Sequence, residues 1–350
     1  MKFNRLILAL LIAVVFFILA GSCYYYSTLG AVEIATPAEG STKMENLSPV
    51  APASCFIETK ADFSLTKKLV TYPDNPSPGD FLIIEGGPFD NPDNLRLTFD
   101  FPGALSQQYP VGNLIYIIVG ISCDTEPGLY QLAFKKGSGE DPAGRETVLA
   151  ADMEIVPKKF AFSRFSMPAD RTAGWTAAHL EEDREKVRQA RERTELHPLW
   201  TDPFISPLAG AGRISSQYGA VRVINNNPPR RHVGIDIAAD EGTPVVSTNR
   251  GIVRLAEFLL SGGNTVIVDH GMGLSSSYLH LDEIAVESGQ WLECGDIVGT
   301  VGMTGYATGP HLHWEVNIGQ DAVNPEQLMD GDLLWVPPAY VSKMVFEREN

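Results

Sequence analysis

Residues 302–315 read GMTGYATGPHLHWE, a glycine-rich stretch that ends in the histidine pair His311 and His313. Because side chains alternate between the two faces of a β-strand, residues two apart project from the same face. The two imidazoles are therefore expected side by side on one strand. An isolated pair of this kind indicates a metal site only weakly, since two surface histidines give the same spacing.

Further candidate metal ligands, His232 and Asp236, flank Gly234, where the backbone can bend freely. Imidazole nitrogens and carboxylate oxygens are both good ligands for Zn²⁺, and two imidazoles with one carboxylate make three protein ligands. A tetrahedral ion then keeps one position for water, as in catalytic sites, whereas a structural site is closed by four ligands that usually include thiolates. The chain has no CxxC pair. These residues predict one catalytic Zn²⁺ ion per chain.

His280 lies between these two groups in the sequence and is the candidate for proton transfer. A water molecule that attacks a peptide bond must lose a proton, and the oxyanion and the leaving amine need a donor. Many zinc peptidases use the glutamate of an HExxH motif, which this chain lacks. Since neutral imidazole can accept or donate a proton near pH 7, His280 and one member of the His311–His313 pair are the expected substitutes.

In these motifs, residues 205–327 resemble the lysostaphin-type (LytM-type) zinc metalloendopeptidases, a family of peptidoglycan hydrolases. The matching residues are His232-x-x-x-Asp236, the stretch 302–315 and, between them and in the same order, GTPV at 242–245, GNTV at 263–266 and DHG at 269–271. The resemblance implies a compact two-sheet β fold with the zinc ion in a groove. The substrate that it implies is the peptide part of peptidoglycan, in its cross-links or stem peptides.

The resemblance also implies a role for each candidate residue. His232, Asp236 and His313 would bind the zinc ion. His280 and His311 would activate water and stabilise the transition state. Which of these two histidines is the general base stays open.

Two other features of this region have their own interpretations. His270 follows a predicted strand and is expected to be a structural histidine. The segment 225–230, which precedes His232, is expected to line the groove.

Two alternatives to a peptidoglycan hydrolase stay open. Some members have lost zinc ligands and regulate other wall enzymes. Because every expected ligand and catalytic histidine is present here, an enzyme is favoured. The alternatives are a non-catalytic wall-binding activator of other hydrolases, and a zinc peptidase that acts on exported proteins in place of wall peptides.

The composition limits the partners. Among 350 residues, 27 Lys and Arg stand against 43 Asp and Glu, which gives a net charge of −16. A nucleic-acid-binding protein needs a basic footprint, so nucleic acid is not expected as a partner. Electrostatic docking on anionic lipid is disfavoured for the same reason. Nothing in the sequence indicates an oligomeric state.

The length predicts two domains with connectors, and the expected class is mainly β. Residues 58–157 show short alternating strands separated by turn clusters, typical of an immunoglobulin-like β sandwich. The apolar run from Leu114 to Val119 suits a strand buried on both faces. Residues 158–204 are expected to form a charged linker with a solvated helix near 181–195, and residues 328–350 a C-terminal tail.

The first 23 residues predict export. A positively charged start precedes an apolar run of fifteen residues, and small residues then lead to Cys23. The run is short for a membrane span, which needs about 20 residues. The segment also resembles a lipobox, which implies lipidation of Cys23 and a membrane-anchored protein in the periplasm or cell envelope. An ordinary cleaved signal and an uncleaved anchor stay open.

Residues 24–57 are rich in small and polar residues and are expected to form a flexible tether. Outside the cytosol, disulfides persist. Cys55 and Cys123 are therefore either a disulfide pair or two unpaired buried thiols.

Overall fold

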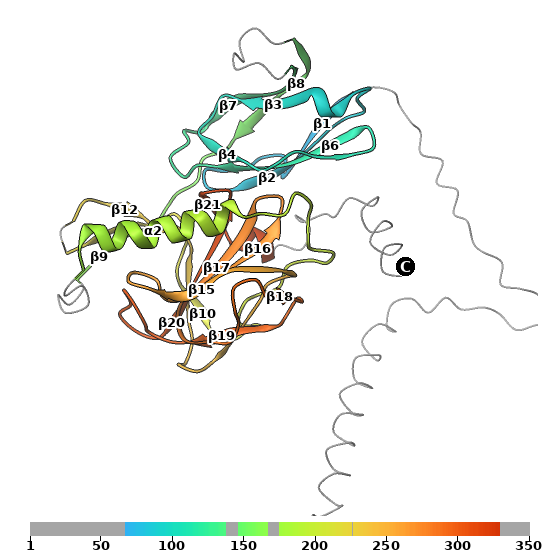
Figure 1. The fold of residues 1–350 in the computed structure, drawn as a ribbon. Helices are drawn as coiled ribbons and strands as arrows, with labels where there is room; N and C mark the ends of the chain where they lie inside the picture. The colour runs from blue at the N-terminus through green and yellow to red at the C-terminus, as the bar shows by residue number, and fades with distance from the viewer. Residues whose placement is uncertain (1–66, 138–145, 167–174, 226, 330–350) are drawn as a thin grey trace, which may run out of the picture. The chain divides into compact units, whose positions relative to one another are not determined.

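The computed structural model describes residues 67–137, 146–166, 175–225 and 227–329. By its contacts the chain divides into two units, residues 1–62 and 63–350, and the described residues belong to the second. They are mainly β with few helices, as the sequence predicts (Figure 1). Within them, no helix is long and apolar enough to cross a membrane. The predicted export segment with Cys23, the tether and most of the predicted tail lie outside the described residues.

Two sheets form the N-terminal region. The elements are β1 (Lys68–Tyr72), β2 (Phe81–Gly87), the 3-10 helix η1 (Pro92–Asn94), β3 (Leu95–Phe99), β4 (Gly103–Leu105), β5 (Tyr109–Val111), β6 (Leu114–Ile121), β7 (Gly128–Lys136) and β8 (Thr147–Ile155). One sheet has the order β1–β2–β6–β4, with β5 paired to β6, and the other has the order β3–β7–β8. Both sheets contribute to one apolar core, which includes Leu82 of β2, Ile117 of β6 and Phe134 of β7. The more specific immunoglobulin-like assignment stays a prediction.

The sheet that contains β6 is buried on both faces. Ile117 and Val119 of β6 belong to the core between the two N-terminal sheets. Ile118, which points the other way, joins Phe81 of β2 in a second core shared with the C-terminal region. The side-chain amide of Gln327 accepts from the backbone N–H of Phe81 at 2.8 Å and donates to its C=O at 3.2 Å. The prediction that this strand, β6, is buried on both faces is confirmed, and the C-terminal region packs on its second face.

The C-terminal region is built on a ten-stranded sheet. Its strands are β10 (Arg213–Ser216), β13 (Ile235–Ala238), β14 (Pro244–Val246), β15 (Gly251–Leu259), β16 (Gly263–Gly271), β17 (Leu274–Ile284), β18 (Trp291–Leu292), β19 (Ile297–Val301), β20 (His311–Ile318) and β21 (Asp321–Val323). The main path runs β10–β13–β20–β17–β16–β15–β18, with β19 paired to β17 and β14, and β21 paired to β20. The short helix α3 (Glu326–Met329) follows. The register places His313 of β20 opposite Asp236 on one side and Leu279 on the other.

The predicted linker contributes both a strand and a helix to this region. Strand β9 (Phe162–Phe165) pairs with β11 (Val221–Ile224), which also pairs with β12 (Arg230–Arg231) in a three-stranded sheet. Helix α2 (Ala177–Glu192) begins after Thr176, whose hydroxyl accepts from the backbone N–H of His179 at 3.2 Å, an N-terminal cap.

Helix α2 is docked along one face, whereas its charge density predicts a solvated helix. Val187 and Ala190 pack with Leu255, Leu259 and Ile267 of β15 and β16. The helix also carries ion pairs between its own side chains, such as Arg184 with Glu181, as expected. The helix therefore covers part of the sheet that carries the candidate ligands (Figure 1).

Candidate active site

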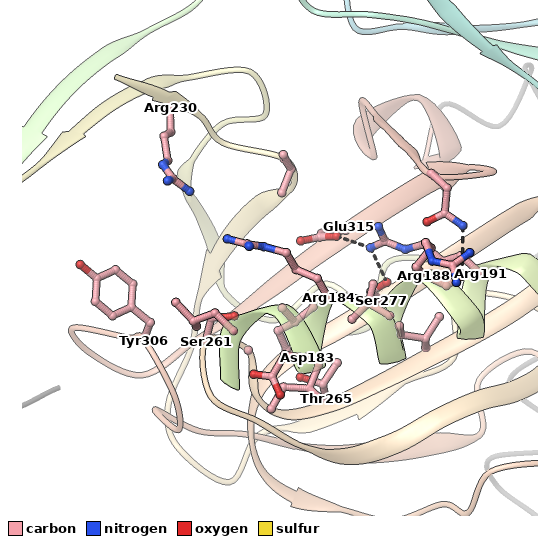
Figure 2. A pocket seen from close by; sticks show the side chains of 18 of the residues that line it. Asp183, Arg184, Arg188, Arg191, Arg230, Ser261, Thr265, Ser277, Tyr306 and Glu315 are labelled. Carbon is pink, nitrogen blue, oxygen red and sulfur yellow. Dashed lines mark hydrogen bonds and ion pairs between the residues drawn. The ribbon is translucent and has the colours of Figure 1, made fainter. Parts of the chain in front are cut away.

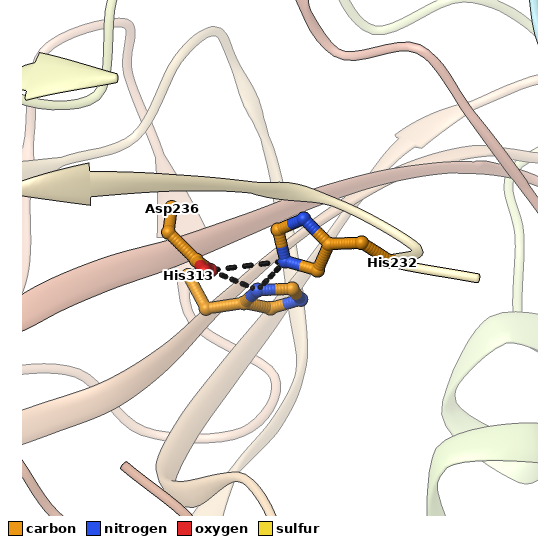
Figure 3. A group of neighbouring side chains, drawn as sticks. All are labelled: His232, Asp236 and His313. Carbon is orange, nitrogen blue, oxygen red and sulfur yellow. Dashed lines mark hydrogen bonds and ion pairs between the residues drawn. The ribbon is translucent and has the colours of Figure 1, made fainter. Parts of the chain in front are cut away.

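Three candidate metal ligands meet at one point, as Figure 3 shows. The Nε2 atom of His232 lies 3.0 Å from Oδ1 of Asp236 and 3.0 Å from Nδ1 of His313. The third distance, from His313 Nδ1 to Asp236 Oδ1, is 2.7 Å. Two imidazoles and a carboxylate that converge in this way fit a divalent ion such as Zn²⁺.

The backbone around Gly234 makes this convergence possible. Asp236 lies on β13 and His313 directly opposite on β20. His232 precedes β13, so the chain must pass close to β20 to bring its ring back to the same point. A Cβ atom at Gly234 would lie 2.4 Å from the carbonyl oxygen of Trp314 and 2.9 Å from Nε2 of His313. Only glycine fits this close approach.

Each candidate ligand is held by a second hydrogen bond on its outer side. Nδ1–H of His232 donates to the carbonyl of Gln217 at 2.9 Å. Nε2–H of His313 donates to Glu315 at 3.0 Å, and Arg222 donates to Oδ2 of Asp236 at 2.5 Å. Because carbonyl and carboxylate oxygens only accept, each ring carries a proton on its outer nitrogen. The inner nitrogens contact Oδ1 of Asp236, and a metal that displaces their protons would find lone pairs there, as ligation requires.

The two remaining histidines lie beside this group. The rings of His280 and His311 have centroids 4.8 Å apart, and Nε2 of His311 is 3.7 Å from Oδ1 of Asp236. Nδ1 of His280 bonds to the carbonyl of Thr304 at 2.9 Å, and Nδ1 of His311 to that of Gly309 at 2.8 Å. Both rings therefore carry a proton on Nδ1 and leave Nε2 free to accept one.

The backbone of His280 has φ +63°, a left-handed conformation that is rare for residues other than glycine. It lies where β17 changes partner, since Leu279 pairs with β20 whereas Leu281 pairs with β19. The conformation occurs where the histidine approaches the candidate ligands, and such strain clusters at functional sites.

Burial and neighbouring charges set the protonation of the group. Burial lowers the pKa of His232, and burial together with His313 and His311 lowers the pKa of His280 to about 3. Burial raises the pKa of Asp236. Hydrogen bonds from His232 and His313 outweigh this effect and hold the pKa of Asp236 far below its usual range. Burial also lowers the pKa of His313, yet Asp236 and a second carboxylate raise it to about 9. A bound cation must displace that proton.

A cleft of about 810 Å³ lies on the outer side of the candidate ligands, and none of the five predicted site residues lines it. Arg222 and Glu315, which bond to Asp236 and His313, are among its lining residues. Its walls come from α2, from the segment around β11 and β12, and from strands β15 to β17. Figure 2 shows Arg184 of α2 and Arg230 of β12 extending into it from different walls. Asn227, Pro228 and Arg230 line it, in line with the expectation for the segment 225–230.

All five predicted site residues lie together, although they come from separate stretches of the sequence: His232, Asp236, His280, His311 and His313. His270 lies apart, fully buried, with its ring nitrogens bonded to the carbonyl of Arg250 at 2.7 Å and to Ser276 Oγ at 2.8 Å. That position agrees with a structural role. Cys123 bonds to Tyr218 at 3.1 Å, and its pairing with Cys55 stays a prediction because Cys55 lies outside the described residues.

Sequence reasoning missed three residues of the site. Glu315 follows His313 by two positions on a strand, so the same alternation that pairs His311 with His313 could have found it. Arg222 and Arg191 have no such local signal, because their contacts with Asp236 and Glu315 join distant parts of the chain.

Comparison with known proteins identifies the region. The model of Peptidase family M23 matches residues 230–325. Two curated relatives are peptidoglycan DD-endopeptidase ShyA of Vibrio cholerae, 37% identical over 37% of this chain and 32% of that protein, and DD-carboxypeptidase/endopeptidase Mpg of Neisseria meningitidis serogroup B, 38% identical over 35% and 28%. The chain thus spans about a third of the length of the curated relatives that it matches.

A solved structure shares the fold over a longer stretch. It is the crystal structure of a Pseudomonas aeruginosa protein assigned to peptidase M23, with a TM-score of 0.51 and 24% identity over 73% of this chain and 95% of that chain. The family match includes His232, Asp236 and the His311–His313 pair. The chain therefore contains a peptidase family M23 domain of the lysostaphin type, which confirms the family predicted from the sequence.

Proposed function

We propose that the protein is an exported zinc metalloendopeptidase that hydrolyses peptide bonds in peptidoglycan cross-links or stem peptides. One observation carries the proposal: His232, Asp236 and His313 converge, with His280 and His311 beside them, next to a large cleft. The names of the relatives, which are peptidoglycan endopeptidases, support the substrate class.

The arrangement of the histidines suits hydrolysis. When bound, Zn²⁺ would polarise the scissile carbonyl and acidify its water ligand. His280 and His311 each hold a proton on Nδ1 through a backbone carbonyl and offer Nε2 to the substrate side. One of them can accept the proton of the attacking water on Nε2 and pass it to the leaving amine. The other can donate to the oxyanion from Nε2 only when its ring carries protons on both nitrogens.

The cleft supports a peptide substrate that carries carboxylates. Arg184 and Arg230 project into it, although the chain as a whole is acidic. Guanidinium groups bind carboxylates in a bidentate geometry, and stem peptides end in a carboxylate. These arginines are proposed to hold the anionic end of the peptide while the scissile bond lies at the metal.

The proposal that the protein is exported to the cell envelope rests on the N-terminal sequence alone. Lipidation of Cys23 would attach the protein to a membrane of the cell envelope, where its substrate occurs. Palmitate labelling in cells tests this step. Label on the natural chain and none on Cys23→Ala is expected; equal label on both would contradict it.

The test of activity is a digest of purified peptidoglycan, read by mass spectrometry of the released muropeptides. New peptide ends are expected with the Zn²⁺-loaded protein and not after chelation. His313→Ala should lose metal binding and activity together. His280→Asn should keep the metal but lose most turnover, because asparagine tolerates the left-handed backbone and lacks an imidazole. His179→Asn, in an exposed histidine of α2, is the matched control and should behave as the natural chain.

Two outcomes would contradict the proposal. A protein that binds one equivalent of Zn²⁺ and releases no peptide, yet activates another hydrolase, would be the non-catalytic activator. Cleavage of proteins without release of muropeptides would indicate a peptidase with a different substrate.

A further inference from the structure

The carboxylate that holds His313 is itself held by the linker helix. Glu315 lies two residues after His313 on β20, on the same face, and its Oε1 accepts from Nε2–H of His313 at 3.0 Å. Its other oxygen, Oε2, accepts from Nη2 of Arg191 at 2.7 Å. The Arg191 and Glu315 side chains are only 12% and 10% exposed. A carboxylate this buried needs a cation beside it, and within the described residues its ion-pair partners are Arg191 and the ring of His313.

Helix α2 is fixed to the sheet at several points along its length. Asp183 accepts from the backbone N–H of Leu260 at 2.6 Å, and Lys186 bonds to Glu257 of β15 at 3.0 Å. Ala190, next to Arg191, is buried in the contact with β15 and β16. The docking of α2 on the sheet therefore fixes the position of Arg191 and places its guanidinium beside Glu315.

We propose that Arg191 is a positioning residue of the metal centre, acting through Glu315 on the ring of His313. The inference rests on the proposed metal site and adds to it a residue that lies outside the matched stretch 230–325. A histidine that binds a metal through Nδ1 must keep its proton on Nε2 and hold its ring in one rotation. Glu315 does both while Nη2 of Arg191 holds its other oxygen in place. The linker thereby completes the metal site.

The chemistry of the contact distinguishes two replacements at position 191. Arg191 bonds to Glu315 through Nη2, which also reaches Ser277 Oγ at 3.5 Å, while its Nε has no hydrogen-bond partner among the described residues (Figure 2). The contact thus needs one donor and one positive charge at this place, and not the full guanidinium fork. Lysine can supply both, whereas methionine fills similar space and supplies neither.

The test measures metal affinity in the full-length chain, by competition between the protein and a chelator for Zn²⁺ at fixed pH. Arg191→Met is expected to weaken Zn²⁺ binding about 10- to 100-fold, the usual effect of losing an outer partner of a ligand. Arg191→Lys should stay within about threefold of the natural chain, since the charge and one donor remain. The absorption spectrum of bound Co²⁺ should change in Arg191→Met and be restored in Arg191→Lys.

Lys186→Met is the matched control. It removes a cation of the same helix that also bonds to the sheet, but it does not touch Glu315. Its Zn²⁺ affinity should equal that of the natural chain. Equal weakening in Lys186→Met and Arg191→Met would overturn the proposal, because it would show a general effect of helix docking. Natural affinity in Arg191→Met would overturn it directly.

Glu315→Gln provides a second route if Arg191→Met does not fold without metal, as judged by circular dichroism. It keeps the size of the side chain but removes the charge that Arg191 pairs with, so about tenfold weaker binding is expected. Unchanged affinity would again overturn the proposal. A natural chain that binds Zn²⁺ as expected but cleaves no peptide would refute the proposed function and leave this inference standing, whereas one that does not bind Zn²⁺ would refute both.

Discussion

Asp269 joins the linker to the peptidase sheet through a buried carboxylate, and its replacement by asparagine should be strongly destabilising. The residue is 2% exposed and accepts five hydrogen bonds. Two come from the linker, Thr194 Oγ1 at 2.8 Å and the N–H of Glu195 at 3.0 Å. The others come from the N–H of Gly271 at 2.9 Å and from Arg254, Nη2 at 2.8 Å and Nε at 3.2 Å.

The magnitude follows from what asparagine cannot do. Asp269→Asn keeps the shape but has one acceptor oxygen, and its NH₂ group would face donors. Breaking a buried ion pair on one side costs about 3–5 kcal/mol. Because Arg254 also bonds to Glu195 at 2.9 Å, its charge stays partly compensated and the lower end, about 3 kcal/mol, applies. Because the temperature shift per kcal/mol falls as the chain lengthens, the unfolding temperature of this 350-residue chain should fall by about 4–6 °C.

Urea unfolding of the chelated protein, followed by tryptophan fluorescence, measures this free energy. Asp240→Asn, at an exposed position of the same region, is the matched control and should change the stability by less than about 0.5 kcal/mol. If the free energy of unfolding of Asp269→Asn lies within about 0.5 kcal/mol of that of the natural chain, the Asp269 carboxylate does not stabilise the contact between linker and sheet, and the reasoning is refuted.

Three further predictions concern buried groups. Burial lowers the pKa of His270 to about 4, so the unfolded chain protonates first as the pH falls below about 6.5; stability is full above that pH and declines by up to about 3 kcal/mol towards pH 4. Urea unfolding at pH 7 and pH 5 checks this, and the loss should shrink in His270→Gln. Gly234→Ala would push a methyl group to 2.9 Å from Nε2 of His313, and chelator competition should show Zn²⁺ binding weakened by about tenfold or more. Tyr278→Phe removes a buried hydroxyl that bonds to the N–H of Thr248 and to Ser276, both at 2.9 Å, so thermal unfolding should reveal a loss of about 1–3 kcal/mol.

The part of the site that sequence could predict is the part built from local spacing. His311 and His313 share a face because a strand alternates, and the residues around Gly234 match a family motif. The number of residues between these two motifs does not predict that they meet in the fold. Their meeting depends on the pairing of β13 with β20, which one residue of register shift would destroy.

The role of helix α2 could not be predicted, for a physical reason. Its sequence is dense in mixed charge, and only short apolar side chains such as Val187 and Ala190 mark the face that docks. A pattern this weak is typical of an exposed helix. The contact of Arg191 with Glu315 is decided by the packing of the helix on β15 and β16, which becomes visible only in three dimensions.

The position of strand β6 between two cores determines how the protein unfolds. Its alternate residues belong to two different cores, and Gly120 lies so close to β21 that a Cβ atom there would be 2.9 Å from a methyl group of Val323. Neither the N-terminal nor the C-terminal region can unfold without exposing apolar residues of the other to solvent. Amide hydrogens in β6 should therefore exchange with solvent only through global opening, at the same rate as those in the centre of β17. A fragment that contains the matched stretch alone would expose the apolar residues that β2 and β6 cover in the full chain, so the C-terminal region should be most stable when it is expressed together with the two N-terminal sheets.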